Sequence, residues 1–135
     1  MSGEKNLEKL IASMDPVLSE DAFIFATLTT TDFELLRSLE PIGTFHEREG
    51  LTVIVRKEKA DEFDIPYSSV LKCITLNVHS SLAAVGLTAA FATKLTKSNI
   101  SANVVAGYYH DHIFISVHDA DKALAALKQL AREGR

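Results

Sequence analysis

The polar residues best suited to bind a ligand or take part in a reaction are concentrated in one stretch of the sequence, residues 72–118. Within it, His79, Ser80 and Ser81 follow a strand-like run and precede an alanine-rich helical pattern. A helix N-terminus offers unpaired backbone N–H groups and the positive end of the helix dipole, and Ser81 stands where an N-cap would stand. These features predict a binding site for a carboxylate-bearing ligand at His79, Ser80 and Ser81.

Two histidines flank an aspartate at His110, Asp111 and His112. On a strand, His110 and His112 would share a face and could bind zinc with His79 as a third ligand. The same residues fit a tight turn, in which Asp111 accepts backbone N–H groups and the histidines end the two strands. The turn is favoured, so we expect no metal and no cofactor. A metal-binding protein or small enzyme using the three histidines is the alternative.

Glu47 and Glu49 stand two residues apart in a predicted strand and should share a face with Phe45. Their carboxylates could bind an ammonium group or act as a general base. Two carboxylates with this spacing are also common on an exposed strand, and that solvated face is the favoured interpretation. Glu47 and Glu49 are therefore secondary candidates for ligand binding.

Motifs that would indicate an enzyme are missing from the sequence. It contains no HExxH motif, no cysteine pair, no Ser/His/Asp signature and no glycine-rich phosphate loop. Its one cysteine, Cys73, lies in a strand-like run, where a small buried side chain is favoured over a nucleophile. We therefore predict no catalytic residue and no enzyme.

Composition narrows the class of protein further. The 135 residues are 47% hydrophobic and 24% charged, with a net charge of -4, as expected of one small globular domain or two subdomains. The acidic balance argues against a nucleic-acid partner. No apolar run approaches the roughly 20 residues of a membrane helix. The first residues, MSGEKNLEKL, lack the apolar core of a secretion signal, so we expect a cytoplasmic protein.

Hydrophobic periodicity predicts the elements that position these residues. Strands are predicted at residues 22–29, 42–49, 51–57, 70–78, 102–109 and 112–118, and helices or helical turns at 6–14, 32–39, 58–63, 82–95 and 120–134. Gly50 is placed at a hairpin turn with positive φ, and Gly86 within a helix or its first turn. The order strand, helix, strand, strand, helix thus occurs twice along the chain, which indicates two copies of one plan.

This plan resembles the ACT domain, the βαββαβ ferredoxin-like module of amino-acid-regulated enzymes. The strings VHSSLAAVGLTAAFATKL and NISANVVAGYYHDHIFISV resemble the second half of a family of small stand-alone bacterial tandem ACT-like proteins, and FHEREGLTVIV resembles its first half. The resemblance covers nearly the whole chain. It implies an α+β fold of two ferredoxin-like ACT-type subdomains, residues 1–68 and 69–135, with antiparallel or mixed sheets and helices on one face. The closing strand of the second copy is absent, and we expect the first half to supply it.

The resemblance also implies a site and a function. In similar proteins, amino acids bind between the loop after one strand and the start of the next, which corresponds here to Ser80, Ser81, Val85, Gly86, Leu87, Ser101, Asn103 and Val104. The Asn103 amide could both donate to and accept from an amino-acid head group. The alternative is that Ser81 is only an N-cap, Gly86 a packing contact and Asn103 a strand-end residue.

The function expected from this resemblance is non-catalytic regulation or sensing through an amino acid or similar small metabolite. Exposed sheet edges and alanine-rich helices also predict a homodimer. A protein-interaction module without a ligand is a further alternative.

Overall fold

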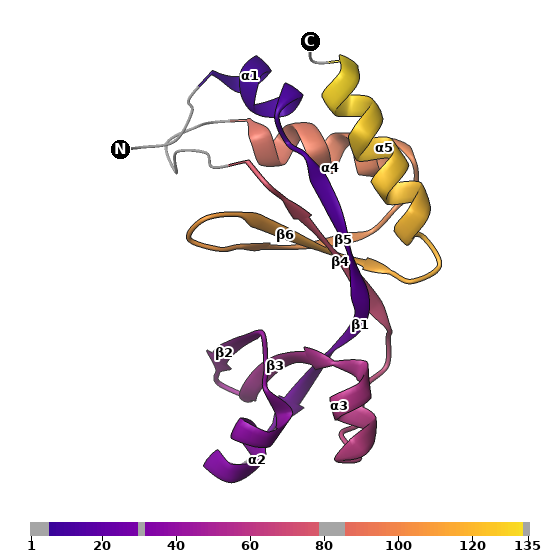
Figure 1. Ribbon diagram of the computed structural model, residues 1–135. Coiled ribbons are helices and arrows are strands. Elements are labelled where there is room, and N and C mark those ends of the chain that lie inside the picture. Colours follow the sequence, from indigo (N-terminus) through magenta and orange to yellow (C-terminus); the bar gives the residue numbers. More distant parts are fainter. Residues whose placement is uncertain (1–5, 30–31, 79–85, 134–135) are drawn as a thin grey trace. The chain divides into compact units, whose positions relative to one another are not determined.

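The computed structural model describes residues 6–29, 32–78 and 86–133, which fold as two compact units (Figure 1). The central unit comprises residues 20–71, and the terminal unit comprises residues 1–19 together with 72–135. The division at residues 68 and 69 stays a prediction about where one ACT-type copy ends and the next begins. In the structure, residues 1–19 belong to the same compact unit as residues 72–135.

The central unit follows a βαββα plan. It contains most of strand β1 (Pro16–Leu28), then helix α2 (Phe33–Leu39), strands β2 (Gly43–Glu47) and β3 (Gly50–Arg56), and helix α3 (Lys57–Glu62). The strands lie in the order β2-β3-β1 and are antiparallel. Alternate residues of β1 face the core, where Ile24 and Leu28 pack against Val53 and Val55.

Gly50 does not occupy the position that the sequence predicted. It is the first residue of β3 and pairs with Glu47, so the hairpin turn consists of Arg48 and Glu49. The predicted positive φ at Gly50 is wrong; among the described glycines, Gly86 has that conformation. A Cβ at Gly50 would lie 2.6 Å from Thr27 Oγ1 and 3.0 Å from the Leu28 carbonyl oxygen. Glycine is therefore required here by the close approach of β1.

The terminal unit contains α1 (Leu7–Ala12), β4 (Leu71–Leu76), α4 (Leu87–Lys97), β5 (Ala102–Ala106), β6 (Asp111–Ser116) and α5 (Ala120–Glu133). Its strand order is β1-β4-β6-β5, and β5 and β6 are antiparallel. The three helices cover one face of these strands, where their apolar side chains form a core with Ile74, Leu76, Ile113 and Ile115 (Figure 1). The α+β, ferredoxin-like fold class is confirmed.

The start of β1 closes the sheet of the terminal unit. Lys72 Nζ donates to the Ser19 carbonyl oxygen and the Cys73 N–H donates to Ser19 Oγ, both at 3.0 Å. The Asn77 N–H donates to the Asp15 carbonyl oxygen at 3.3 Å. The expectation that the first half of the chain supplies the missing strand is therefore confirmed. This pairing also explains why β1 begins at Pro16, six residues before the predicted strand.

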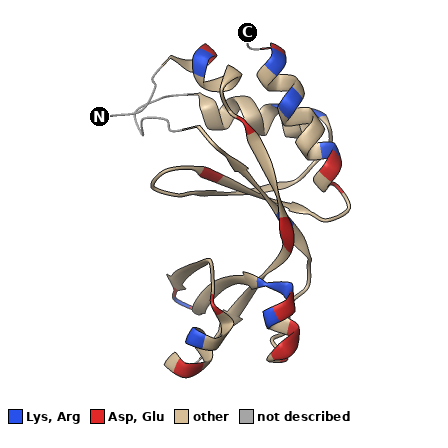
Figure 2. Ribbon diagram, in the orientation of Figure 1, with Lys and Arg blue, Asp and Glu red and all other residues tan. Residues whose placement is uncertain are grey.

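The two units differ in charge (Figure 2). Residues 20–71 contain eleven Asp or Glu and five Lys or Arg, which gives a net charge of −6. The remaining residues contain seven Asp or Glu and nine Lys or Arg, which gives +2. The acidic character of the chain therefore belongs to the central unit.

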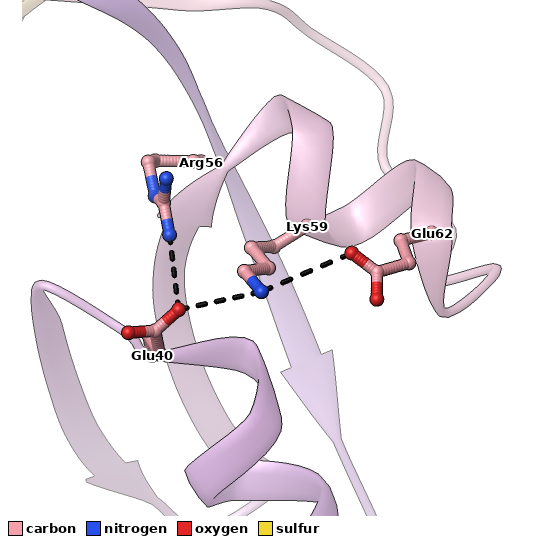
Figure 3. A network of polar contacts seen from close by, with 4 residues as sticks. All are labelled: Glu40, Arg56, Lys59 and Glu62. Carbon is pink, nitrogen blue, oxygen red and sulfur yellow. Dashed lines mark hydrogen bonds and ion pairs between the residues drawn. The ribbon is translucent and has the colours of Figure 1, made fainter.

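A surface network ties α2 to the start of α3 (Figure 3). Glu40, the C-cap of α2, has a left-handed backbone with φ 48°. Its Oε1 accepts from Arg56 Nη2 at 3.1 Å and lies 3.3 Å from Lys59 Nζ, which is 3.8 Å from Glu62 Oε1. The Glu40 side chain is 60% exposed, so this network adds modestly to stability.

Replacing Glu40 by glutamine should lower the free energy of unfolding by less than about 1 kcal/mol, because it removes charge from a largely solvated network. The loss should shrink at high salt, where surface charges are screened. Urea unfolding at low and high salt measures both effects. Glu20→Gln, which removes an exposed carboxylate from β1, is the matched control; a Glu40 effect independent of salt would contradict an electrostatic role.

Candidate ligand site at the start of helix α4

Helix α4 begins at Leu87, and Gly86 is its N-cap, with φ 102° and ψ −13°. The Ala90 N–H donates to the Gly86 carbonyl oxygen at 2.8 Å, which makes the first turn. The prediction that Ser81 caps this helix is therefore wrong. The predicted site residues His79, Ser80, Ser81 and Val85 lie outside the described residues.

Gly86 lies against helix α1. A Cβ at Gly86 would come within 3.1 Å of Leu7 Cδ2, and the backbone conformation is one that residues with a side chain rarely adopt. Leu87 is 4% exposed and packs in the core of the terminal unit. A packing role for Gly86 is thus visible in the structure, and the Leu87 side chain contributes to the core.

The three predicted site residues near β5 do not all face the same way. Asn103 pairs with Phe114, and Val104 pairs with Ile113, which belongs to the core beneath the helices. Successive strand residues point to opposite faces, so Asn103 lies on the face away from the helices. Ser101 and Asn103 are both exposed and two residues apart. A ligand on that face would therefore meet Asn103 and not the Val104 side chain.

The segment His110 to His112 is divided between a turn and a strand. The Gly107 N–H donates to the His110 carbonyl oxygen at 2.9 Å, and Asp111 begins β6. This geometry matches the favoured interpretation, a turn. His110 lies outside the strand, whereas His112 lies within β6. His110 Nδ1 is buried without a hydrogen-bond partner among the described residues.

A row of polar side chains connects β4 to this hairpin. His112 Nδ1 and Thr75 Oγ1 share a hydrogen bond of 2.9 Å, whose donor depends on the histidine tautomer. Cys73 Sγ lies 3.8 Å from Thr75 Oγ1. Burial raises the pKa of the Cys73 thiol, so this cysteine lacks the thiolate character of an activated nucleophile. Within residues 6–29, 32–78 and 86–133, no three His, Cys, Asp or Glu side chains are grouped to hold a metal ion.

His112 predicts a pH dependence of stability. Burial, followed by the neighbouring His110, lowers the pKa of the His112 imidazole, so folding favours its neutral form. The contribution of His112 to the free energy of unfolding is fully present above the unfolded pKa of about 6.5, and it is lost as the pH falls below that value. Burial raises the pKa of the Asp111 carboxyl from 3.8. This shift has the opposite effect on stability, which falls as the pH rises, and it acts at a lower pH than the His112 shift.

We therefore expect the free energy of unfolding to fall between about pH 7.5 and 5.5, the two sides of the usual histidine pKa. It should fall less in His112→Asn, because the asparagine side chain does not titrate. Urea unfolding at both pH values is the measurement, with His118→Asn as a control on an exposed histidine. An equal pH effect in wild type and His112→Asn would rule out His112 as the source.

Glu47 and Glu49 do not lie on one strand. Glu47 ends β2, where its Oε1 accepts a hydrogen bond from Thr52 Oγ1, whereas Glu49 belongs to the hairpin turn. Glu49 Oε2 lies 3.9 Å from Arg48 Nε, and both side chains are highly exposed. The predicted shared strand face is therefore wrong.

Two open hollows occur elsewhere on the described surface. One, of about 480 Å³, lies between α4 and α5. The other, of about 280 Å³, is lined by Glu20, Asp21, Ala22, Arg56, Lys57, Glu58 and Asp61. These linings include no described residue of the predicted site. No helix in the described part of the chain is long and apolar enough to cross a membrane.

Comparison with known proteins identifies the family. Two ACT domain models match, one over residues 2–72 and the other over residues 68–129. The chain therefore belongs to the ACT domain family, with two ACT-type domains in tandem. No curated protein sequence matches the chain.

Solved structures agree with this fold. The chain is similar to a Vibrio cholerae protein of unknown function, described as a possible transport protein, with 51% identity, a TM-score of 0.85, and coverage of 94% of this chain and 97% of the other. The ligand-free regulatory subunit of aspartate kinase from Thermus thermophilus has 11% identity and a TM-score of 0.65, over 87% and 97% of the two chains. Clostridium acetobutylicum aspartate kinase has 11% identity and a TM-score of 0.63, over 87% of this chain and 34% of that one.

Proposed function

We propose that this protein is a non-catalytic regulatory or sensing protein that binds an amino acid or a similar small metabolite. The observation that carries the proposal is the pair of ACT domain matches, which together span residues 2–129. The similar regulatory subunit of aspartate kinase supports a regulatory role for this fold. The raised pKa of the buried Cys73 thiol adds support, because it removes the most reactive side chain from the candidates for catalysis.

We place the ligand at the start of α4 and, as the resemblance to similar proteins implies, at the start of β5, where Asn103 lies on the face of the sheet away from the helices. The candidates that precede the Gly86 N-cap in the sequence are His79, Ser80, Ser81 and Val85. Backbone N–H groups in the first turn of the eleven-residue α4 favour a carboxylate. The exposed Asn103 amide, with Ser101 beside it, offers both a donor and an acceptor to an ammonium and carboxylate head group. Binding would then favour one conformation of the protein over another.

A thermal-shift screen against the twenty amino acids tests this proposal. A ligand present at about 100 times its Kd adds about 2.7 kcal/mol to stability and raises Tm. Asn103→Ala should abolish the shift caused by the active amino acid, whereas Gln129→Ala, which removes an exposed amide from α5, should preserve it. No shift with any amino acid, or an equal shift in both variants, would count against the proposed site.

We also propose that the protein is a cytoplasmic homodimer. The single cysteine, Cys73, is a buried free thiol, which suits a reducing compartment. Large apolar side chains are exposed on the described surface of both units, and they include Phe33, Tyr108 and Tyr109. Exposed apolar groups of this size favour association.

A further inference from the structure

The hollow between α4 and α5 has the features of a receptor for an aromatic side chain. It is about 480 Å³ in volume and is lined by Ala89, Ala90, Thr93, Lys94, Lys97, Leu130 and Glu133. The two alanines leave space between the helices, and Leu130 adds an apolar wall. A flat ring could therefore lie in this open groove against the two alanines and Leu130.

The rim of this groove is basic. Lys94 Nζ lies 3.5 Å from Glu133 Oε1, whereas Lys97 is exposed and has no ion pair with any described residue. The two lysines outnumber the one carboxylate in the lining. A partner that places a carboxylate beside its aromatic ring would complement this rim.

Helix α2 carries such a combination. Phe33 is its first residue and is 75% exposed, which is unusual for a large apolar side chain. Next to it, the Glu34 side chain is 78% exposed and lies 3.6 Å from Arg37 Nη2. Asp32 holds the helix start, because its Oδ1 accepts from the N–H groups of Glu34 and Leu35. Phe33 is therefore presented on a capped helix end beside a solvated carboxylate.

We propose that two copies of the chain associate through this pair of surfaces: Phe33 of one copy enters the α4–α5 groove of the other, and Glu34 faces Lys97. The net charges of −6 for the central unit and +2 for the terminal unit favour this contact between copies. Each chain contains both surfaces, Phe33 in the central unit and the α4–α5 groove in the terminal unit. The inference rests on the proposed self-association and is independent of ligand binding.

The test is the concentration dependence of mass, measured by light scattering and sedimentation. Phe33→Ala should weaken dimerisation at least about tenfold, a modest loss for an aromatic anchor at an interface. Phe45→Ala removes an equally exposed ring from β2 and should leave the dimer unchanged. Circular dichroism should confirm that every variant is folded.

Charge reversal makes the test specific. Glu34→Lys and Lys97→Glu should each weaken dimerisation, and the combined E34K/K97E variant should restore it, because the pair is re-formed with opposite signs. Loss of Glu34 from the first turn of α2 lowers helix stability equally in Glu34→Lys and in the double variant. A change in helix stability therefore cannot explain a recovery of dimerisation in the double variant.

Three results would overturn the inference. A dimer that is insensitive to Phe33→Ala, or a double variant as weak as the single ones, would reject these surfaces while leaving self-association intact. A monomer at every concentration would reject both the surfaces and the proposed homodimer.

Discussion

Replacing Phe91 by alanine should lower the free energy of unfolding by about 3–5 kcal/mol. Phe91 lies in the middle of α4 and is 0% exposed, packed in the core that contains Ile74 and Leu127. Removing its ring leaves a cavity in a core of buried Leu, Ile and Met side chains, which can relax only partly. The loss should appear as a lower urea midpoint with an unchanged m-value.

Phe45→Ala is the matched control for Phe91→Ala. Phe45 is 71% exposed, so its loss should change the free energy of unfolding by no more than about 0.5 kcal/mol. A Phe91 effect below about 1 kcal/mol would mean that α4 does not pack on the sheet as described, since a buried phenylalanine rarely costs so little.

Replacing Gly86 by alanine should cost about 1–2 kcal/mol from the backbone alone, because φ 102° is unfavourable for a residue with a side chain. The new Cβ would also lie 3.1 Å from Leu7 Cδ2, so the Leu7 side chain must give way by a few tenths of an ångström. Urea unfolding measures the total loss. If Gly86 also shapes the ligand site, the same variant should weaken amino-acid binding.

A Leu7→Ala background separates the backbone cost of Gly86→Ala from its steric cost. Without the Leu7 methyl groups, the steric part of the cost should disappear and the backbone part should persist. Gly86→Ala should therefore cost less in Leu7→Ala than in wild type, but its cost should not vanish. A neutral Gly86→Ala in both backgrounds would be inconsistent with the left-handed N-cap.

The fold was largely predictable because local pattern and family resemblance agree. Leu7 and Leu10 mark the apolar face of α1, and Ile74 and Leu76 mark the core face of β4. The start of β1 was missed because its partner is remote in sequence: Ser19 is polar, and its strand conformation depends on bonds to Lys72 and Cys73. A pattern within one segment cannot reveal such pairing.

The candidate site was less predictable. The alanine-rich run after Ser81 has helical periodicity, which gave no sign that Gly86 caps α4 with a positive φ. Glu47 and Glu49 were assigned to one face because the hairpin turn was placed one residue too late. The bond between Thr75 and His112 depends on how β4 lies beside β6, and neither residue alone signals it.

The central claim is that this tandem ACT protein binds an amino acid, and isothermal titration calorimetry with the twenty amino acids tests it most directly. We predict saturable heat from one amino acid or a small related set with wild-type protein. Asn103→Ala should lose that heat, and Gln129→Ala should retain it. Absence of binding heat for all twenty, at protein concentrations that detect millimolar affinity, would contradict the claim.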